Sequence, residues 1–180
     1  ALIGLGHARA KYPRTENNAG WYQEALVIAQ EIGDLNLQCQ ALIGLGNARA
    51  IHRRTRNNIG WFMDALAIAQ DQLNDPNLQC QALIGLGNAR AINRRTRNNI
   101  GWFVEALKIA QEQLRDPNLQ CQALIGLGNA RAGHERTRNN IGWFMDALTI
   151  AQDQLNDPNL QCQALIGLGN ARAGHERTGN

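Results

Sequence analysis

Four cysteines are the first residues in the sequence whose type could support chemistry. They are Cys39, Cys80, Cys121 and Cys162, and they recur every 41 residues. No CxxC pair or paired histidine accompanies them, so a zinc site is not predicted. Copies one helical repeat apart would lie about two helix spacings of 8–10 Å from each other, too far for a disulfide. We therefore predict free cysteines in the core, no metal, and a reducing compartment such as the cytoplasm.

Two further motifs resemble sites of catalysis or cofactor binding only in part. His134-Glu135 lacks the second histidine, three residues after the glutamate, that zinc proteases need. The Gly-x-Gly at Gly85 and Gly87 lacks the preceding strand and the third glycine of a dinucleotide loop. No arrangement of acid, base and nucleophile emerges elsewhere. We therefore predict that the chain is not an enzyme and uses no cofactor.

Amide side chains form a recurring set that suits binding. On a helix, Gln81, Gly85 and Asn88 fall on one face. The predicted peptide-binding row is His7, Asn47, Asn88, Asn129 and Asn170, with Gln40, Gln81 and Gln122 and the glycines Gly44, Gly85 and Gly126. An amide donates and accepts two hydrogen bonds each, which suits an extended peptide backbone, and glycine would let the ligand approach closely. The alternative is that the amides only solvate a groove or bond neighbouring helices.

Arginines cluster in a polar segment of each repeat. The predicted basic rim consists of Arg53, Arg54, Arg94, Arg95 and Arg136. Acidic residues such as Asp71 and Asp75 cluster at the opposite turn. The rim could steer an acidic ligand, but we favour a solvated edge in which arginine complements a helix C-terminus. The net charge of +3 and the few aromatic residues argue against a nucleic-acid partner.

The composition indicates a folded chain. Of the 180 residues, 44% are apolar and 18% charged, which does not fit disorder. No run approaches the roughly 18 consecutive apolar residues of a membrane span, so no membrane contact is predicted. The sequence begins in mid-pattern, at Ala1, and this suggests a fragment of a longer array.

An internal repeat decides the architecture. The segment Ala-Leu-Ile-Gly-Leu-Gly begins at Ala1, Ala41, Ala82, Ala123 and Ala164, at intervals of 40, 41, 41 and 41 residues. We therefore divide a single domain, 1–180, into repeats 1–40, 41–81, 82–122 and 123–163 and a partial repeat 164–180. A fixed period in this range indicates a solenoid, a propeller or an array.

Each repeat is predicted to form two helices. Asp75 is a good N-cap and Pro76 suits the first helical position. The helix that follows is apolar over most of its girth, so several neighbours should bury it as an inner helix. A turn is expected over 93–98. A second, outer helix should start near residues 98–99 and run to Leu114, with Trp102 and Phe103 in its apolar arc and in the core. The pattern predicts an all-α solenoid of antiparallel helix pairs.

The repeat resembles the tetratricopeptide repeat family, in its longer form of 40–42 residues. The resemblance covers the whole chain. Its carriers are the Leu-Gly pair of the inner helix, followed by Asn47, and the large-x-x-Ala-Leu run of the outer helix. Gly46 and Ala65 have the family's spacing of small residues at the helix crossing, and Phe62 precedes that alanine by three residues. Asn58 departs from the family, which has alanine there. The period also suits HEAT and armadillo repeats.

The resemblance implies a right-handed superhelix whose concave surface is lined by the asparagine row. It also implies a non-enzymatic scaffold that binds a protein or an extended peptide. The alternative is a structural spacer or self-assembly module. In the last inner helix, residues 164–173 repeat the internal sequence and lack the polar face of a capping repeat, so end-to-end association of copies is expected.

Overall fold

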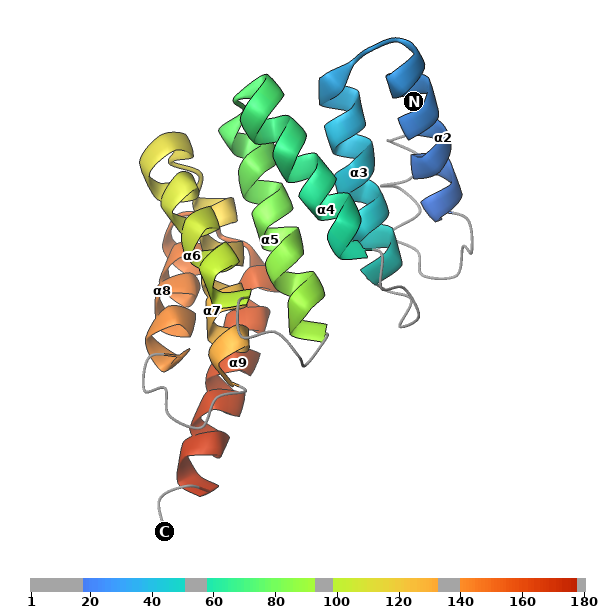
Figure 1. Ribbon diagram of the computed structural model, residues 1–180. Coiled ribbons are helices and arrows are strands. Elements are labelled where there is room, and N and C mark those ends of the chain that lie inside the picture. Colours follow the sequence, from blue (N-terminus) through green and yellow to red (C-terminus); the bar gives the residue numbers. More distant parts are fainter. Residues whose placement is uncertain (1–17, 51–57, 93–98, 133–139, 178–180) are drawn as a thin grey trace. The chain divides into compact units, whose positions relative to one another are not determined.

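The described part of the chain is helical. The computed structural model describes residues 18–50, 58–92, 99–132 and 140–177, and Figure 1 shows the helices in these ranges. The elements are α2 (Asn18–Glu31), α3 (Leu35–Ala50), α4 (Asn58–Ala67), η1 (Ile68–Leu73), α5 (Pro76–Ile92), α6 (Asn99–Ile109), η2 (Ala110–Leu114), α7 (Pro117–Ala132), α8 (Asn140–Asp153) and α9 (Pro158–Arg177). No strand occurs within these ranges. The all-helical prediction is therefore confirmed for this part of the chain.

The helices belong to two compact units, Ala1–Ala89 and Arg90–Asn180. In the first unit, α2 packs on α3 and α3 packs on α4. In the second, the inner helix α7 packs on the outer helices α6 and α8 and on the next inner helix, α9, while α8 also packs on α9. Successive neighbours thus cover each other in the manner of a helical repeat.

The inner helices begin as the sequence predicts. The carboxylate of Asp75 accepts hydrogen bonds from the backbone N–H groups of Asn77 (2.8 Å) and Leu78 (3.1 Å). Pro76, which has no N–H to satisfy, is the first residue of α5. The same caps recur at Asp116 and Asp157. The expected turn over 93–98 lies outside the described residues.

The outer helices end in a way that the sequence did not predict. After α4 and α6, the chain continues as the short π-helices η1 and η2. The carbonyl of Ala69 in η1 accepts hydrogen bonds from the Asp75 N–H (3.0 Å) and from the side-chain amide of Gln79 (3.2 Å). The glutamine of the next inner helix therefore caps the outer helix. The same side-chain bond joins Gln120 to Ala110 and Gln161 to Ala151.

Aromatic rings of the outer helices fill slots between glycines of the inner helices. Phe62 is fully buried, and its ring lies against Gly46 of α3 and Gly85 of α5. A Cβ atom at either glycine would overlap the ring. Phe144 lies in the same way between Gly128 of α7 and Gly167 of α9. One ring thus ties the inner helix of its own repeat to the inner helix of the next.

The tryptophans occupy a more exposed position than predicted. Trp61 and Trp143 are half-buried, whereas their neighbours Phe62 and Phe144 are fully buried. Successive residues on a helix point about 100° apart, so only one of the two rings can enter the glycine slot. The tryptophan therefore lies at the edge of the core, and the phenylalanine lies inside it.

We predict opposite effects for two glycine substitutions in the second unit. Gly126→Ala should destabilise the protein by about 1–3 kcal/mol, because its Cβ would overlap the ring of Phe103. Gly101→Ala should stabilise it by roughly 0.5–1 kcal/mol, because Gly101 lies in a helix with open space at its Cβ position. Urea denaturation followed by circular dichroism measures both. Equal effects of the two substitutions would contradict the slot interpretation.

Candidate functional site

The asparagines of the predicted row are all accessible where they are described. Asn47 on α3, Asn88 on α5, Asn129 on α7 and Asn170 on α9 are exposed to solvent. Their side chains make no hydrogen bond within the described residues, so there they do not serve to join neighbouring helices. His7, which was assigned to the same row, lies outside the described part of the chain. The asparagines therefore present free amide groups on these four inner helices.

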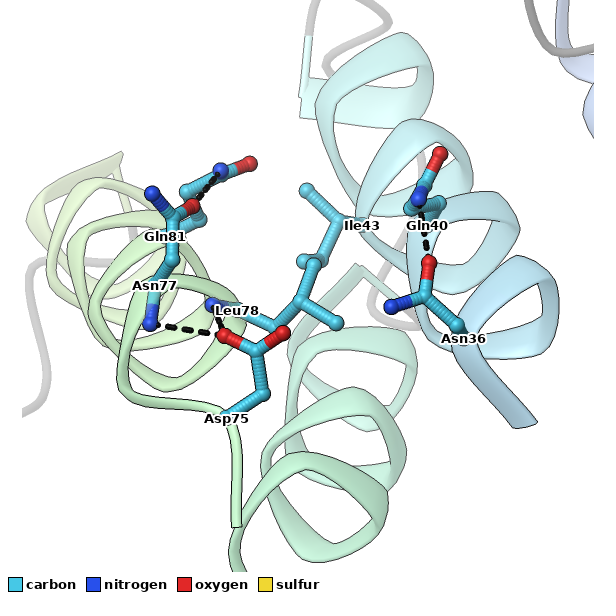
Figure 2. Close-up of a pocket in the computed structure, with 7 residues that line it drawn as sticks. All are labelled: Asn36, Gln40, Ile43, Asp75, Asn77, Leu78 and Gln81. Carbon is cyan, nitrogen blue, oxygen red and sulfur yellow. Dashed lines mark hydrogen bonds between the residues drawn. The ribbon is translucent and has the colours of Figure 1, made fainter. Parts of the chain in front are cut away.

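The glutamines of the row form pairs with asparagines that we did not assign to the site. Gln40, Gln81 and Gln122 each donate a side-chain hydrogen bond to the asparagine four residues earlier, and Figure 2 shows the first two pairs. These partners are Asn36, Asn77 and Asn118. The bond uses one N–H of the glutamine and the asparagine oxygen, which leaves the glutamine oxygen and the asparagine N–H groups for a ligand. The i, i+4 spacing could have revealed this pairing.

The glycines of the row have a different role from the one expected. Gly44, Gly85 and Gly126 are buried, and each lies against the aromatic ring of the preceding outer helix. A ligand cannot approach a backbone that a ring already covers, so the expected close approach does not occur at these residues. The physical reason is the helical register. Gly85 follows Leu78 by seven residues, so it lies nearly above this buried leucine, at the edge of the amide stripe.

A cavity lies between α3 and α5 of the first unit, beside the first two glutamine–asparagine pairs. Its volume is about 310 Å³. The lining residues are Asn36, Gln40, Ile43, Asp75, Asn77, Leu78 and Gln81. Figure 2 shows Ile43 and Leu78 between the two amide pairs, with the Asp75 carboxylate at one end. The cavity combines an apolar floor, neutral amides and one negative charge.

The two charged edges are only partly described. The predicted basic rim lies outside the described residues; it comprises Arg53, Arg54, Arg94, Arg95 and Arg136. Of the predicted acidic cluster, Asp71 and Glu112 lie in η1 and η2, Asp153 is the last residue of α8, and all three are exposed. In the first unit, Asp71 precedes the cavity residue Asp75 by four positions. This end of the first unit therefore carries two acidic residues.

None of the four cysteines forms a disulfide, and three of the four are buried. Cys39, Cys80 and Cys121 are core residues as predicted, whereas Cys162 on α9 is exposed. The thiol of Cys39 donates to the carbonyl oxygen of Ala65 (3.3 Å) and thus joins α3 to α4. Burial, with a smaller contribution from the charge of Asp75, raises the pKa of Cys39 to about 11. Burial and the charge of Asp157 have the same effect on the pKa of Cys121.

Comparison with known proteins gives no assignment. No protein-family model matches the chain, and no curated protein matches it. Within the described ranges, no group of three or more His, Cys, Asp or Glu side chains is arranged to hold a metal ion. None of the helices in these ranges has both the length and the apolar character that a membrane span requires.

We predict that alkaline pH destabilises the protein through the buried thiols. An unfolded thiol ionises near its ordinary pKa of 9.0, whereas Cys39 and Cys121 keep their protons up to about pH 11 in the fold. Their stabilising contribution is complete below about pH 9 and is lost as the pH rises to about 11. Urea denaturation at several pH values should show this decline. The double variant Cys39→Ala, Cys121→Ala should show a smaller decline, and an equal one would contradict the explanation.

Proposed function

We propose that the chain is a non-enzymatic scaffold that binds a protein or an extended peptide along the amide face of its inner helices. The observation that carries the proposal is the repetition of one side-chain pair. Gln40, Gln81 and Gln122 each bond the asparagine four residues earlier. A surface that repeats the same neutral donors and acceptors matches a peptide backbone, which repeats its own N–H and C=O groups.

The chemistry of this surface favours binding over catalysis. Amide side chains do not gain or lose a proton near neutral pH, so they cannot act as general acids or bases. We therefore assign no catalytic residue and no cofactor. The small net charge of +3 favours a protein ligand over a nucleic acid. Four cysteines that form no disulfide favour a reducing compartment such as the cytoplasm.

The proposal includes a tetratricopeptide-like solenoid. The contacts of Gly46 with Phe62 and of Gly128 with Phe144 support it, because the family pairs a small inner-helix residue with the outer helix where the two cross. In a right-handed superhelix of this type, the inner helices would line the concave side. The exposed asparagines, such as Asn47 and Asn88, would then face the ligand.

A peptide-display selection on the intact chain tests this function. The variant Gln40→Ala, Gln81→Ala, Gln122→Ala should bind the selected peptides at least about tenfold more weakly, since each lost hydrogen bond is worth roughly 0.5–1.5 kcal/mol. The matched control replaces exposed glutamines at equivalent positions of the outer helices, in the variant Gln70→Ala, Gln111→Ala, Gln152→Ala. The control should bind like the parent. Circular dichroism checks that both variants keep their helicity.

Two results would count against peptide binding by the amide face. The first is a selection that yields no peptide able to distinguish the parent from the folded inner-helix variant. The second is an equal loss of binding in the outer-helix control. A further variant, Asn47→Ala, Asn88→Ala, Asn129→Ala, shows whether the ligand also uses the asparagine row.

The exposed face of α9 favours a second candidate function, self-assembly through the last helix. Leu165 and Ile166 are 52% and 64% exposed, whereas their equivalents in α7, Leu124 and Ile125, are 3% and 7% exposed. Gly169 has open space where the equivalent glycine of α7 has the ring of Phe144. A helix of a second copy could cover this face as α8 covers α7.

Sedimentation velocity over a range of concentrations tests self-assembly. The parent should associate as its concentration rises, and Leu165→Glu, Ile166→Glu should abolish this association by placing charges in the apolar contact. Met145→Glu is the control, because Met145 is 54% exposed on an outer helix. A parent that remains monomeric at high concentration would exclude the second candidate.

A further inference from the structure

The cavity between α3 and α5 has a chemical character distinct from the rest of the amide face. Its floor is made by Ile43 and Leu78, two side chains that are otherwise buried. An amide pair stands on each side, and a carboxylate stands at one end (Figure 2). With about 310 Å³, the cavity is at the small end of ligand sites, so it suits one long side chain and not a whole ligand.

The carboxylate of Asp75 is only partly used by the fold. Its Oδ1 atom accepts the two N–H groups at the start of α5. Its Oδ2 atom makes no hydrogen bond within the described residues, and Figure 2 shows it on the side of the carboxyl group that faces α3. The negative charge also acts within the fold, since it contributes to the raised pKa of the Cys39 thiol. This oxygen can accept a hydrogen bond from a ligand.

An anionic group does not suit this place. A helix N-terminus ordinarily attracts an anion, but the first N–H groups of α5 are already bonded to Asp75. A second negative charge would meet the full charge of the carboxylate at short range. A positively charged group would instead form a charge-assisted hydrogen bond with it.

The surroundings of the cavity have the same sign. The acidic residues of ranges 18–50 and 58–89 are Glu24, Glu31, Asp34, Asp64, Asp71 and Asp75. The basic residue of these ranges, Arg49, follows Asn36 by thirteen positions on α3, which places its backbone roughly 20 Å farther along the helix. The charged residues nearest in sequence to the lining of the cavity, Asp34 and Asp71, are acidic.

We propose that this cavity binds a lysine or arginine side chain of the bound peptide. The alkyl part of that side chain packs on Ile43 and Leu78. Its charged end donates a hydrogen bond to Oδ2 of Asp75. The inference rests on the proposed peptide-binding function and adds a specificity to it. The specificity is opposite in charge to the acidic ligand that the arginine-rich turns suggested.

The second unit carries the same set of side chains. Asp157 caps α9 as Asp75 caps α5, and the Asn118–Gln122 pair of α7 repeats the Asn36–Gln40 pair of α3. The apolar floor has its equivalents in Ile125 and Leu160, which are both buried. The residues that recognise a basic side chain thus recur along the chain and do not belong to one accidental cavity.

The test uses peptides from the display selection on the intact chain. Lysine and arginine should be enriched at one or more positions. In a synthetic peptide, replacing this residue by norleucine, which keeps the alkyl chain and removes the charge, should weaken binding about threefold to tenfold. Glutamate at the same position should weaken it further. The difference between lysine and norleucine should decrease as salt is added, because added ions screen the charge pair.

A pair of matched variants identifies the carboxylate. Asp75→Asn, Asp116→Asn, Asp157→Asn removes the three cap charges and keeps a good N-cap residue, so the helices should remain folded. This variant should bind the lysine and norleucine peptides equally well. The control, Asp71→Asn, Glu112→Gln, Asp153→Asn, removes the exposed acid four residues earlier in each repeat and should bind like the parent.

The outcomes separate this inference from the function on which it rests. Peptides that require the amide face but show no preference for lysine over norleucine would overturn the basic-side-chain site alone. An equal loss of preference in the cap variant and in the control would do the same, because it would indicate general charge attraction. If the cap variant fails to fold, the affinities of the parent protein for the basic, norleucine and glutamate peptides still test whether the site prefers a basic side chain. The absence of any peptide that requires the amide face would overturn the proposed function itself.

Discussion

The architecture depends on an aromatic ring held between two glycines. The ring of Phe62 needs the space beside both Gly46 and Gly85, and these glycines belong to successive inner helices. Neither helix alone forms the slot, so a single repeat cannot bury its own ring completely. Close packing then requires glycine at both positions, because an added methyl group would have to displace a rigid aromatic side chain. This requirement explains why helices that bury so much surface carry a residue that ordinarily weakens a helix.

The slot also determines what remains exposed on the inner helices. The ring covers the edge of the stripe that holds Gly85, and the rest of the stripe, with Gln81 and Asn88, stays in contact with solvent. At the other end of the outer helix, the side chain of Gln79 bonds the carbonyl of Ala69. The inner helix is therefore held on two sides by the preceding outer helix. An amide face on such a helix presents its side chains from a well-supported backbone, which limits the entropy that a ligand must remove on binding.

Much of the local structure could be predicted from the sequence, because it depends on residues close together in the chain. Asp75 and Pro76 mark the start of α5, and the apolar arc marks the helical run that ends at Leu114. The exposure of Asn88 follows from its place on a polar stripe. The π-helices could not be predicted, because α8 has nearly the same sequence and the same glutamine bond as α4 and yet ends without a π-helix.

Most of the features that the sequence analysis missed depend on contacts between helices. The sequence pattern predicts that Gly85 is accessible to a ligand. The pattern does not show that Phe62, which belongs to another helix, covers this glycine. The cavity combines Ile43 with Asp75 and Leu78, which lie more than thirty residues later, so no local pattern indicates it. The pairing of Gln81 with Asn77 was within reach, since both lie on one helix at a spacing of four residues.

The chemical identity of the glycine slots has a consequence for the folding of the chain. The pair of glycines that receives Phe62 is chemically the same as the pair that receives Phe144. A ring from one repeat would thus fit the slot of another repeat, or of another molecule, about as well as its own. Correct pairing then rests on the short connections between helices, which make the neighbouring slot the first to be reached. At high concentration this kinetic preference weakens, and exchange of helices between molecules becomes the characteristic misfolding route of such a chain.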